Sequence, residues 1–117
     1  MKASQVFSQP ANQLPILGVD ASFIPEIRLA KKKKKNSQGT AEDMLTTLKN
    51  AGVNTIRLRI WKKPADGHSG FDEVASFAKE IKAKGLKVWL TVHYSDWWAD
   101  PGKQTKPAEW QGTSFAQ

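Results

Sequence analysis

The chain of 117 residues contains no cysteine and only two histidines, His68 and His93. Disulfide scaffolds and cysteine-ligated metal centres are therefore excluded, and a histidine-rich metal site is disfavoured. The sequence also lacks a P-loop and a GxGxxG motif, which disfavours nucleotides. We therefore expect neither a metal nor another cofactor.

Long apolar segments are also missing. No window reaches the roughly 18 apolar residues that a membrane-spanning helix needs, so we expect no membrane span. The start of the chain, "MKASQVFSQPANQLP", lacks the apolar stretch of a signal peptide. These features predict a cytosolic protein or the mature form of an exported one. Residues 1–13 are polar and aperiodic and are predicted to be a flexible lead.

Acidic residues are outnumbered, with 11 Asp and Glu against 18 Lys and Arg, which gives a net charge of +7. Five of the basic residues form one run, Lys31–Lys35. Without that run 13 basic residues face 11 acidic ones, and the net charge is +2. Such a run is usually a solvated, self-repelling loop, and contact with an acidic polymer or an anionic surface is the alternative. We expect no nucleic-acid partner.

Strand-like and helix-like segments alternate along the rest of the chain. The first predicted helix begins at Thr40 as its N-cap and ends at Gly52, and the second covers residues 71–84. Residues 24–39 are predicted to be a long connection, and "TSFAQ" at the end resembles the start of a third helix. The strands are predicted at residues 14–23, 53–61 and 86–93. The order strand–helix–strand–helix–strand predicts parallel strands with right-handed crossovers.

The second predicted strand has two different faces. Ile56 and Leu58 point to one side, whereas Arg57, Arg59 and Trp61 point to the other. An open doubly wound sheet would be apolar on both faces. A closed (β/α)₈ barrel accommodates the split better, because its inner face carries polar residues near the mouth. We therefore favour the α/β class and a partial barrel with three strands and two helices, since a whole barrel needs about 250 residues.

Polar and aromatic side chains cluster where the predicted strands end. Barrel enzymes place their sites at these ends, so we expect the side chains to line one cleft. Tryptophan faces beside hydrogen-bonding groups suit a sugar, whose C–H groups stack on rings. The candidate substrate-binding residues are Asp20, Arg59, Trp61, His93, Tyr94, Ser95, Asp96, Trp98 and Asp100.

Each candidate also has a structural interpretation. Arg57 and Arg59 could be paired ions inside the barrel, and His93 a hydrogen-bonded interior histidine. One of Trp97 and Trp98 could anchor a long loop while the other offers a flat face to a ligand. Asp100 precedes a proline and is most often a turn former.

Three segments carry a family resemblance: "GVDASFIPEI", "NAGVNTIRLRIWKKPADGHSG" and "HYSDWWADPGKQTKPAEW". They resemble the N-terminal part of arabinogalactan endo-β-1,4-galactanases, and the likeness covers residues 14–117. The resemblance implies a retaining glycoside hydrolase that cleaves internal β-1,4 bonds of galactan with two glutamates. It places those glutamates on strands four and seven, so no catalytic glutamate is expected within these 117 residues.

The resemblance also implies roles for matching residues. Arg59 would hydrogen-bond the nucleophile, and His93 and Asp96 would border the subsite of the cleaved sugar. Trp98 would stack on galactose. Asp20, Tyr94 and Ser95 would support these groups.

The resemblance further implies secretion or a periplasmic location, galactan as the partner and a monomeric full-length enzyme. One rival hypothesis is a non-catalytic polyanion-binding α/β module that uses the run Lys31–Lys35. Another is a carbohydrate-binding fragment without catalytic activity, whose sugar affinity would depend on Trp98.

Overall fold

The computed structural model describes residues 15–31 and 34–114. The predicted lead at 1–13, part of the lysine run and the end of the predicted third helix lie outside the described residues. The strands are β1 (Gly18–Asp20), β2 (Thr55–Ile60) and β3 (Lys87–Val92). They form one sheet in the order β1-β2-β3, and both neighbouring pairs are parallel. The predicted parallel arrangement is confirmed, although β1 is much shorter than the segment 14–23.

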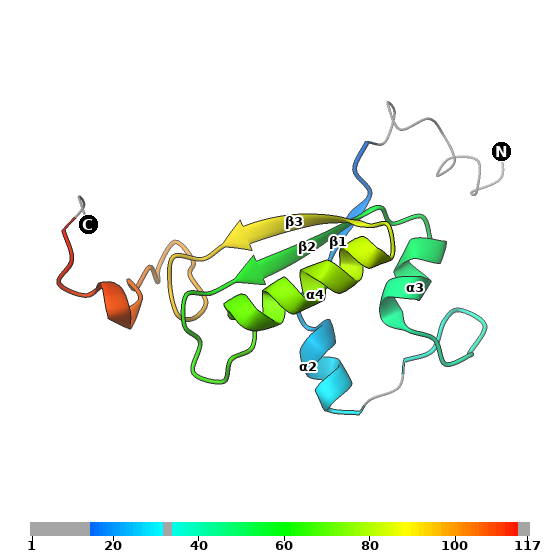
Figure 1. The fold of residues 1–117 in the computed structure, drawn as a ribbon, viewed down its shortest axis with the longest axis horizontal. Helices are drawn as coiled ribbons and strands as arrows, with labels where there is room; N and C mark the ends of the chain where they lie inside the picture. Colours follow the sequence, from blue (N-terminus) through cyan, green and yellow to red (C-terminus); the bar gives the residue numbers. More distant parts are fainter. Residues whose placement is uncertain (1–14, 32–33, 115–117) are drawn as a thin grey trace.

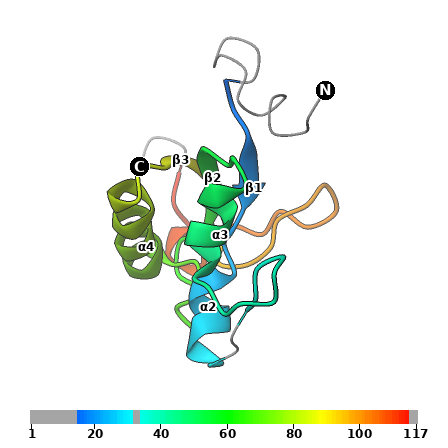
Figure 2. The same cartoon turned by 90° about the vertical axis from the view of Figure 1, so that its right-hand side faces the viewer.

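Three helices cover one face of this sheet, as Figures 1 and 2 show. They are α2 (Ile24–Leu29), α3 (Met44–Asn50) and α4 (Phe71–Ala83). A single 3₁₀ turn, η1 (Ala108–Trp110), follows the long loop after β3. The opposite face of the sheet has no helix over it within the described residues (Figure 2). This one-sided cover is the arrangement of strand and helix in part of a barrel wall.

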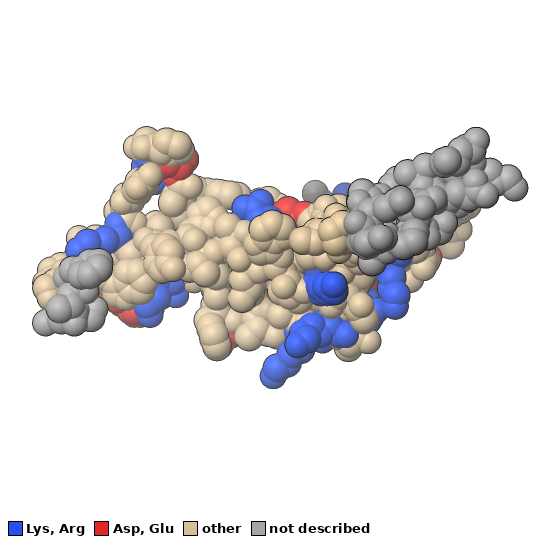
Figure 3. Space-filling view, turned by 90° about the horizontal axis from the view of Figure 1, so that it is seen from above, with Lys and Arg blue, Asp and Glu red and all other residues tan. Residues whose placement is uncertain are grey.

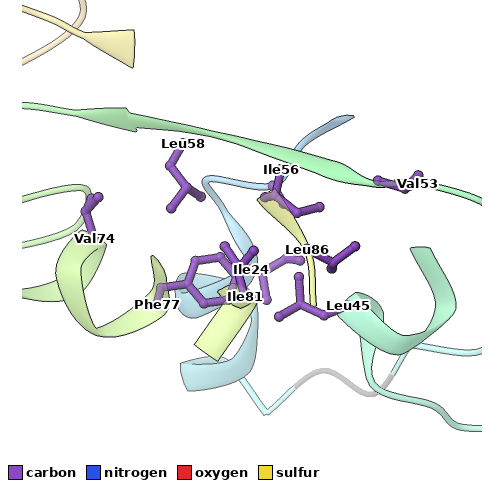
Figure 4. Close-up of a cluster of buried hydrophobic side chains, with 10 residues drawn as sticks. Ile24, Leu45, Val53, Ile56, Leu58, Val74, Phe77, Ile81 and Leu86 are labelled. Carbon is purple, nitrogen blue, oxygen red and sulfur yellow. The ribbon is translucent and has the colours of Figure 1, made fainter. Parts of the chain in front are cut away.

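The core lies between β2 and the helices (Figure 4). Ile56 and Leu58 point down from β2 and are almost completely buried. α4 presents Phe77 and Ile81 to the same cluster because these side chains lie four residues apart on one helix face. The other buried members of the cluster are Ala21, Ile24, Leu45, Val53, Val74 and Leu86. The predicted apolar faces of β2 and of residues 71–84 are thus confirmed.

The start of the first long helix differs from the prediction. Asp43, and not Thr40, is the N-cap of α3, because its Oδ2 accepts the Thr46 N–H at 3.2 Å. Thr40 instead closes a turn, in which its N–H donates to the Asn36 side chain. The end of the helix agrees with the prediction, since Gly52 follows it with a φ of 98°, which glycine adopts at little cost.

Helix α2 lies within residues 24–39, which were predicted to be a connection. It begins with Ile24, 2% exposed, and carries Pro25 in its first turn, where proline is well tolerated. Arg28 then joins three helices: it donates to both carboxylate oxygens of Glu80 at 2.8 and 2.9 Å and to Asp43 at 2.7 Å. These partners are partly exposed, so each pair is worth about 1 kcal/mol or less. The network fixes the orientation of α2.

The apolar face of β3 is only partly covered. Leu90 is paired in register with the buried Leu58 but is 49% exposed, and Val92 is 50% exposed. Phe71, at the start of α4, is 71% exposed and borders the same apolar groove of about 340 Å³. β3 is also an edge of the sheet, so its unpaired backbone groups add to the exposed surface. Within residues 15–31 and 34–114, no helix has the length and apolar character that crossing a membrane requires.

We expect the chain to self-associate through this uncovered face of β3. Leu90→Glu should reduce self-association, because it places a charge beside the apolar groove without entering the core. Sedimentation velocity over a range of concentrations measures the effect, with Lys87→Glu as the matched control on the same strand. A sharp monomeric peak with cooperative melting of the unmodified chain would contradict this prediction.

Candidate functional site

The C-terminal ends of the three strands meet at one end of the sheet. Asp20 ends β1, Arg59 lies near the end of β2, and His93 directly follows β3. The His93 N–H donates to the Ile60 carbonyl at 2.9 Å, which carries the pairing of β2 and β3 into this region. The three strands run towards the same end of the sheet, and the register pairs Asp20 with Arg57, two residues before Arg59. Figure 3 views the helix-free side, where scattered Lys and Arg and a few acidic groups interrupt a mostly uncharged surface.

Arg57 joins all three strands across this helix-free face. Its Nη1 lies 3.2 Å from Asp20 Oδ2 on β1, and its Nε–H donates to Thr91 Oγ on β3 at 2.8 Å. Asp20 also accepts the Ser22 N–H at 3.0 Å. Both Asp20 and Arg57 remain substantially exposed, so the pair contributes little net stability. Arg57 therefore serves as a structural ion and also forms part of the cleft surface.

Arg59 is 4% exposed and lies among three aromatic rings. Its guanidinium carbon lies 4.0 Å from the centre of Phe23, 4.5 Å from Trp98 and 4.8 Å from Trp61. The Arg59 Nε has no hydrogen-bond partner among the described residues. Burial lowers the pKa of Arg59, although the group remains a cation. Arg59 is therefore a desolvated positive charge held by rings. Within the described part of the chain it is not paired with a carboxylate, as a structural ion would be.

His93 is an uncharged hydrogen-bonding group in this arrangement. Burial lowers its pKa, and the positive charges of Arg59 and Arg57 lower it further. Its Nδ1 accepts the Ala99 N–H at 3.4 Å, which assigns the proton to Nε2. The imidazole meets Trp98 edge-on at 5.8 Å. The neutral ring thus has one N–H left to donate to a ligand.

The tryptophans divide into a buried anchor and an exposed pair. Trp61 is buried and stacks on Trp97 with ring centres 4.8 Å apart. It also meets Trp98 edge-on at 5.5 Å. Trp97 and Trp98 are each more than two-fifths exposed. The loop after β3 is therefore anchored on Trp61, while Trp97 and Trp98 both keep accessible ring surface.

Asp96 joins two loops through its carboxylate. Its Oδ1 accepts the Lys63 N–H at 2.9 Å, and its Oδ2 accepts the Ala108 N–H at 2.8 Å. Ser95 lies beside it, and its carbonyl accepts the Lys62 N–H at 2.9 Å. Asp96 and Ser95 thus hold the loop after β3 against the loop after β2.

Glu109 strengthens the same junction and was not among the candidate site residues. It pairs with Lys62 at 2.8 Å and with Lys63 at 2.7 Å. Hydrogen bonds from Lys62 and Lys63 lower the pKa of Glu109 to about 2. The only available signal was the doublet of lysines after the second strand, which does not identify its partner 46 residues away.

A cleft of about 560 Å³ opens between the end of β3 and the loop that follows. Tyr94 is among its walls and is 71% exposed. Asp100 contributes a wall and also forms a turn, because it accepts the Gly102 N–H at 2.8 Å. The lining residues are Arg57, Thr91, Val92, His93, Tyr94, Ala99, Asp100, Pro101, Gln104 and Lys106. Gln104 and Lys106 were not among the predicted site residues.

The predicted residues therefore separate into groups. His93, Tyr94 and Asp100 line the cleft. The remaining candidates outside its lining are Asp20, Arg59, Trp61, Ser95, Asp96 and Trp98. Within residues 15–31 and 34–114, no group of three or more His, Asp or Glu side chains is placed to hold a metal ion.

The parallel sheet with helices on one face, and aromatic and polar groups at its C-terminal ends, defines part of an α/β barrel wall. Comparison with known proteins agrees. Residues 16–117 match the model of the family described as glycosyl hydrolase family 53. The chain belongs to this family.

Named relatives extend the comparison. An arabinogalactan endo-β-1,4-galactanase from Thermothelomyces thermophilus is 45% identical over 80% of the chain, and an endo-β-1,4-galactanase from Bacillus subtilis is 38% identical over 86%. The solved GH53 catalytic domain of Ignisphaera aggregans is 43% identical, with a TM-score of 0.82 over 86% of the chain. The aligned part of the chain corresponds to only 28%, 25% and 30% of these proteins.

The two histidines should respond to pH in opposite directions. The pKa of His93 is lowered below 6.5, so its contribution to stability is lost as pH falls through 6.5 towards that lower value. The hydrogen bond to Glu73 raises the pKa of His68 above 6.5, so its contribution is present below 6.5 and is lost as pH rises. NMR titration of the imidazole resonances measures both values. A His93 midpoint above that of His68 would contradict the site geometry.

Proposed function

We propose that the chain provides part of the substrate-binding wall of a retaining endo-β-1,4-galactanase, a glycoside hydrolase acting on galactan or arabinogalactan. The observation that carries this proposal is the family match over residues 16–117, together with a cleft at the C-terminal end of parallel strands. The names of the Thermothelomyces and Bacillus relatives support the substrate. Exposed tryptophan faces beside fixed hydrogen-bonding groups support a sugar ligand.

In this proposal the polar groups of the wall have different roles. Arg59 hydrogen-bonds the nucleophilic carboxylate and keeps it ionised, a role supported by its desolvated guanidinium held among three rings. His93 donates from Nε2 to the sugar beside the cleaved bond. Asp96 borders that subsite by holding its loop, since both of its carboxylate oxygens accept backbone N–H groups.

The remaining candidates complete the proposed wall. Trp98 offers its exposed face to a galactose ring, and Trp61 anchors the loop on which Trp98 lies. Tyr94 and Asp100 contact sugar from the wall of the cleft. Asp20 supports them by holding Arg57 in place.

We also propose that the two catalytic glutamates lie outside these 117 residues. Glu109 is unsuited to the acid role, because its pKa of about 2 keeps it ionised at any ordinary pH. Glu26 lies on α2, on the helix-covered side of the sheet. A complete enzyme of this kind would be secreted or periplasmic, where galactan is accessible. It would also be monomeric.

Galactan binding should depend on Trp98. We expect Trp98→Ala to weaken binding of galactotetraose about threefold to tenfold, the range of a lost ring contact. Trp89→Ala is the control, because Trp89 is also an exposed tryptophan, 55% against 42% for Trp98, and lies on β3 rather than on the loop beyond it. Chemical-shift titration measures both affinities. Equal losses in the two variants would contradict the role of Trp98.

Purified chain 1–117 should release no galacto-oligosaccharide from galactan, because it carries neither proposed catalytic glutamate. Reducing-end assays and chromatography of the products measure this. The full-length Bacillus relative is the positive control. Release of oligosaccharides by 1–117 would overturn the proposed location of the glutamates.

A further inference from the structure

Phe23 is the aromatic residue nearest to the buried charge of Arg59. It lies in the turn between β1 and α2, and its ring centre is 4.0 Å from the guanidinium carbon. The preceding residue, Ser22, accepts the Arg59 backbone N–H on its hydroxyl at 3.0 Å. Two consecutive residues of one turn therefore hold both the backbone and the side chain of Arg59.

The other two rings approach Arg59 from different elements. Trp61 follows β2, and Trp98 belongs to the loop after β3, at 4.8 and 4.5 Å from the guanidinium carbon. The charge is thus enclosed by rings that follow all three strands. A planar guanidinium stacked in this way keeps its N–H groups pointing outward at the edge.

Enclosure by rings has two consequences for an anion at that edge. Water is displaced from the charge, so attraction to an opposite charge is stronger than it would be in solvent. The stacked rings also restrict rotation of the long Arg59 side chain, which lowers the entropy lost on binding. Phe23 is 48% exposed, so one face of its ring borders solvent while the ring covers the guanidinium.

We propose that Phe23 is a positioning residue, whose ring holds the Arg59 guanidinium so that its N–H edge faces a carboxylate. This inference rests on the proposed function, in which that carboxylate belongs to the glutamate nucleophile. Phe23 acts through Arg59 and needs no contact with the sugar. The role requires an aromatic ring, because only a π face attracts the cation.

An apolar cap without a ring is the alternative, and two substitutions separate it from the proposal. Phe23→Leu keeps apolar volume and removes the π face, whereas Phe23→Tyr keeps the ring. Because Phe23 is half exposed, neither change enters the core. Phe71→Leu is the matched control, since Phe71 is an exposed phenylalanine at the start of α4 and is not one of the three rings around Arg59.

The experiment uses chain 1–117 labelled with ¹⁵N and follows the Arg59 Nε–H resonance. Acetate is the probe and stands in for the glutamate carboxylate. We expect an upfield-shifted proton in the unmodified chain, since the rings shield it, and a downfield move in Phe23→Leu. Acetate affinity should fall about threefold to tenfold in Phe23→Leu, within the range of a cation–π contact. Phe23→Tyr and Phe71→Leu should bind as the unmodified chain does.

Three results would overturn the proposal. The first is that Phe23→Leu leaves both the Arg59 resonance and the acetate affinity unchanged. The second is that Phe23→Tyr loses as much acetate affinity as Phe23→Leu. The third is that acetate does not shift the Arg59 resonance of the unmodified chain. Trp98→Leu provides a second variant, which should also move the Arg59 resonance downfield. Titration of the same samples with galactotetraose tests the proposed substrate separately from the role of Phe23. Loss of sugar binding with intact acetate binding would count against the proposed substrate and leave the role of Phe23 standing.

Discussion

Strand β2 is the element on which both the core and the site depend. It is the central strand, and it alternates Ile56 and Leu58 towards the helices with Arg57 and Arg59 towards the opposite face. Parallel pairing with β1 and β3 then fixes the level at which each side chain emerges. A slip of one residue would place both arginines in the apolar core, at a cost of several kcal/mol for each unpaired charge. The burial of Ile56 and Leu58 therefore also determines the position of Arg59.

The two arginines of β2 illustrate how neighbouring charges are stabilised differently. Arg57 is exposed and is satisfied by Asp20 and Thr91. Arg59 is buried, and rings in place of carboxylates surround it. A buried cation without a carboxylate is costly unless something compensates it. The aromatic enclosure provides part of that compensation, and no hydrogen bond from the Arg59 side chain to another described residue is present.

Much of the fold was accessible from the sequence, because the alternation in residues 53–61 and the spacing in 71–84 both arise from local geometry. The position of α2 could not be predicted, because six residues are too few to show a helical periodicity in the sequence. Its Arg28 is oriented by Glu80, which lies 52 residues away. The cap at Asp43 competed with an equally plausible Thr40. The resemblance predicted that Asp96 and Ser95 belong near the site, but their contacts with the neighbouring loop depend on tertiary structure.

Charged side chains connect the loop after β2 with the loop after β3, and these contacts help to determine the shape of the site. Asp96 accepts the backbone N–H of Lys63, and Glu109 pairs with the side chains of both Lys62 and Lys63. Because Glu109 lies within η1, the same contacts set the position of Trp110, whose ring is 6.3 Å from Tyr94 on the wall of the cleft. The ion pairs are exposed and individually weak, so the loop is held mainly by the stacking of Trp97 on the buried Trp61 and by the hydrogen bonds of Ser95 and Asp96. The loop after β3 is therefore held by an aromatic contact together with hydrogen bonds and is oriented by charge, which allows it to present Trp98 and Tyr94 while remaining on the surface.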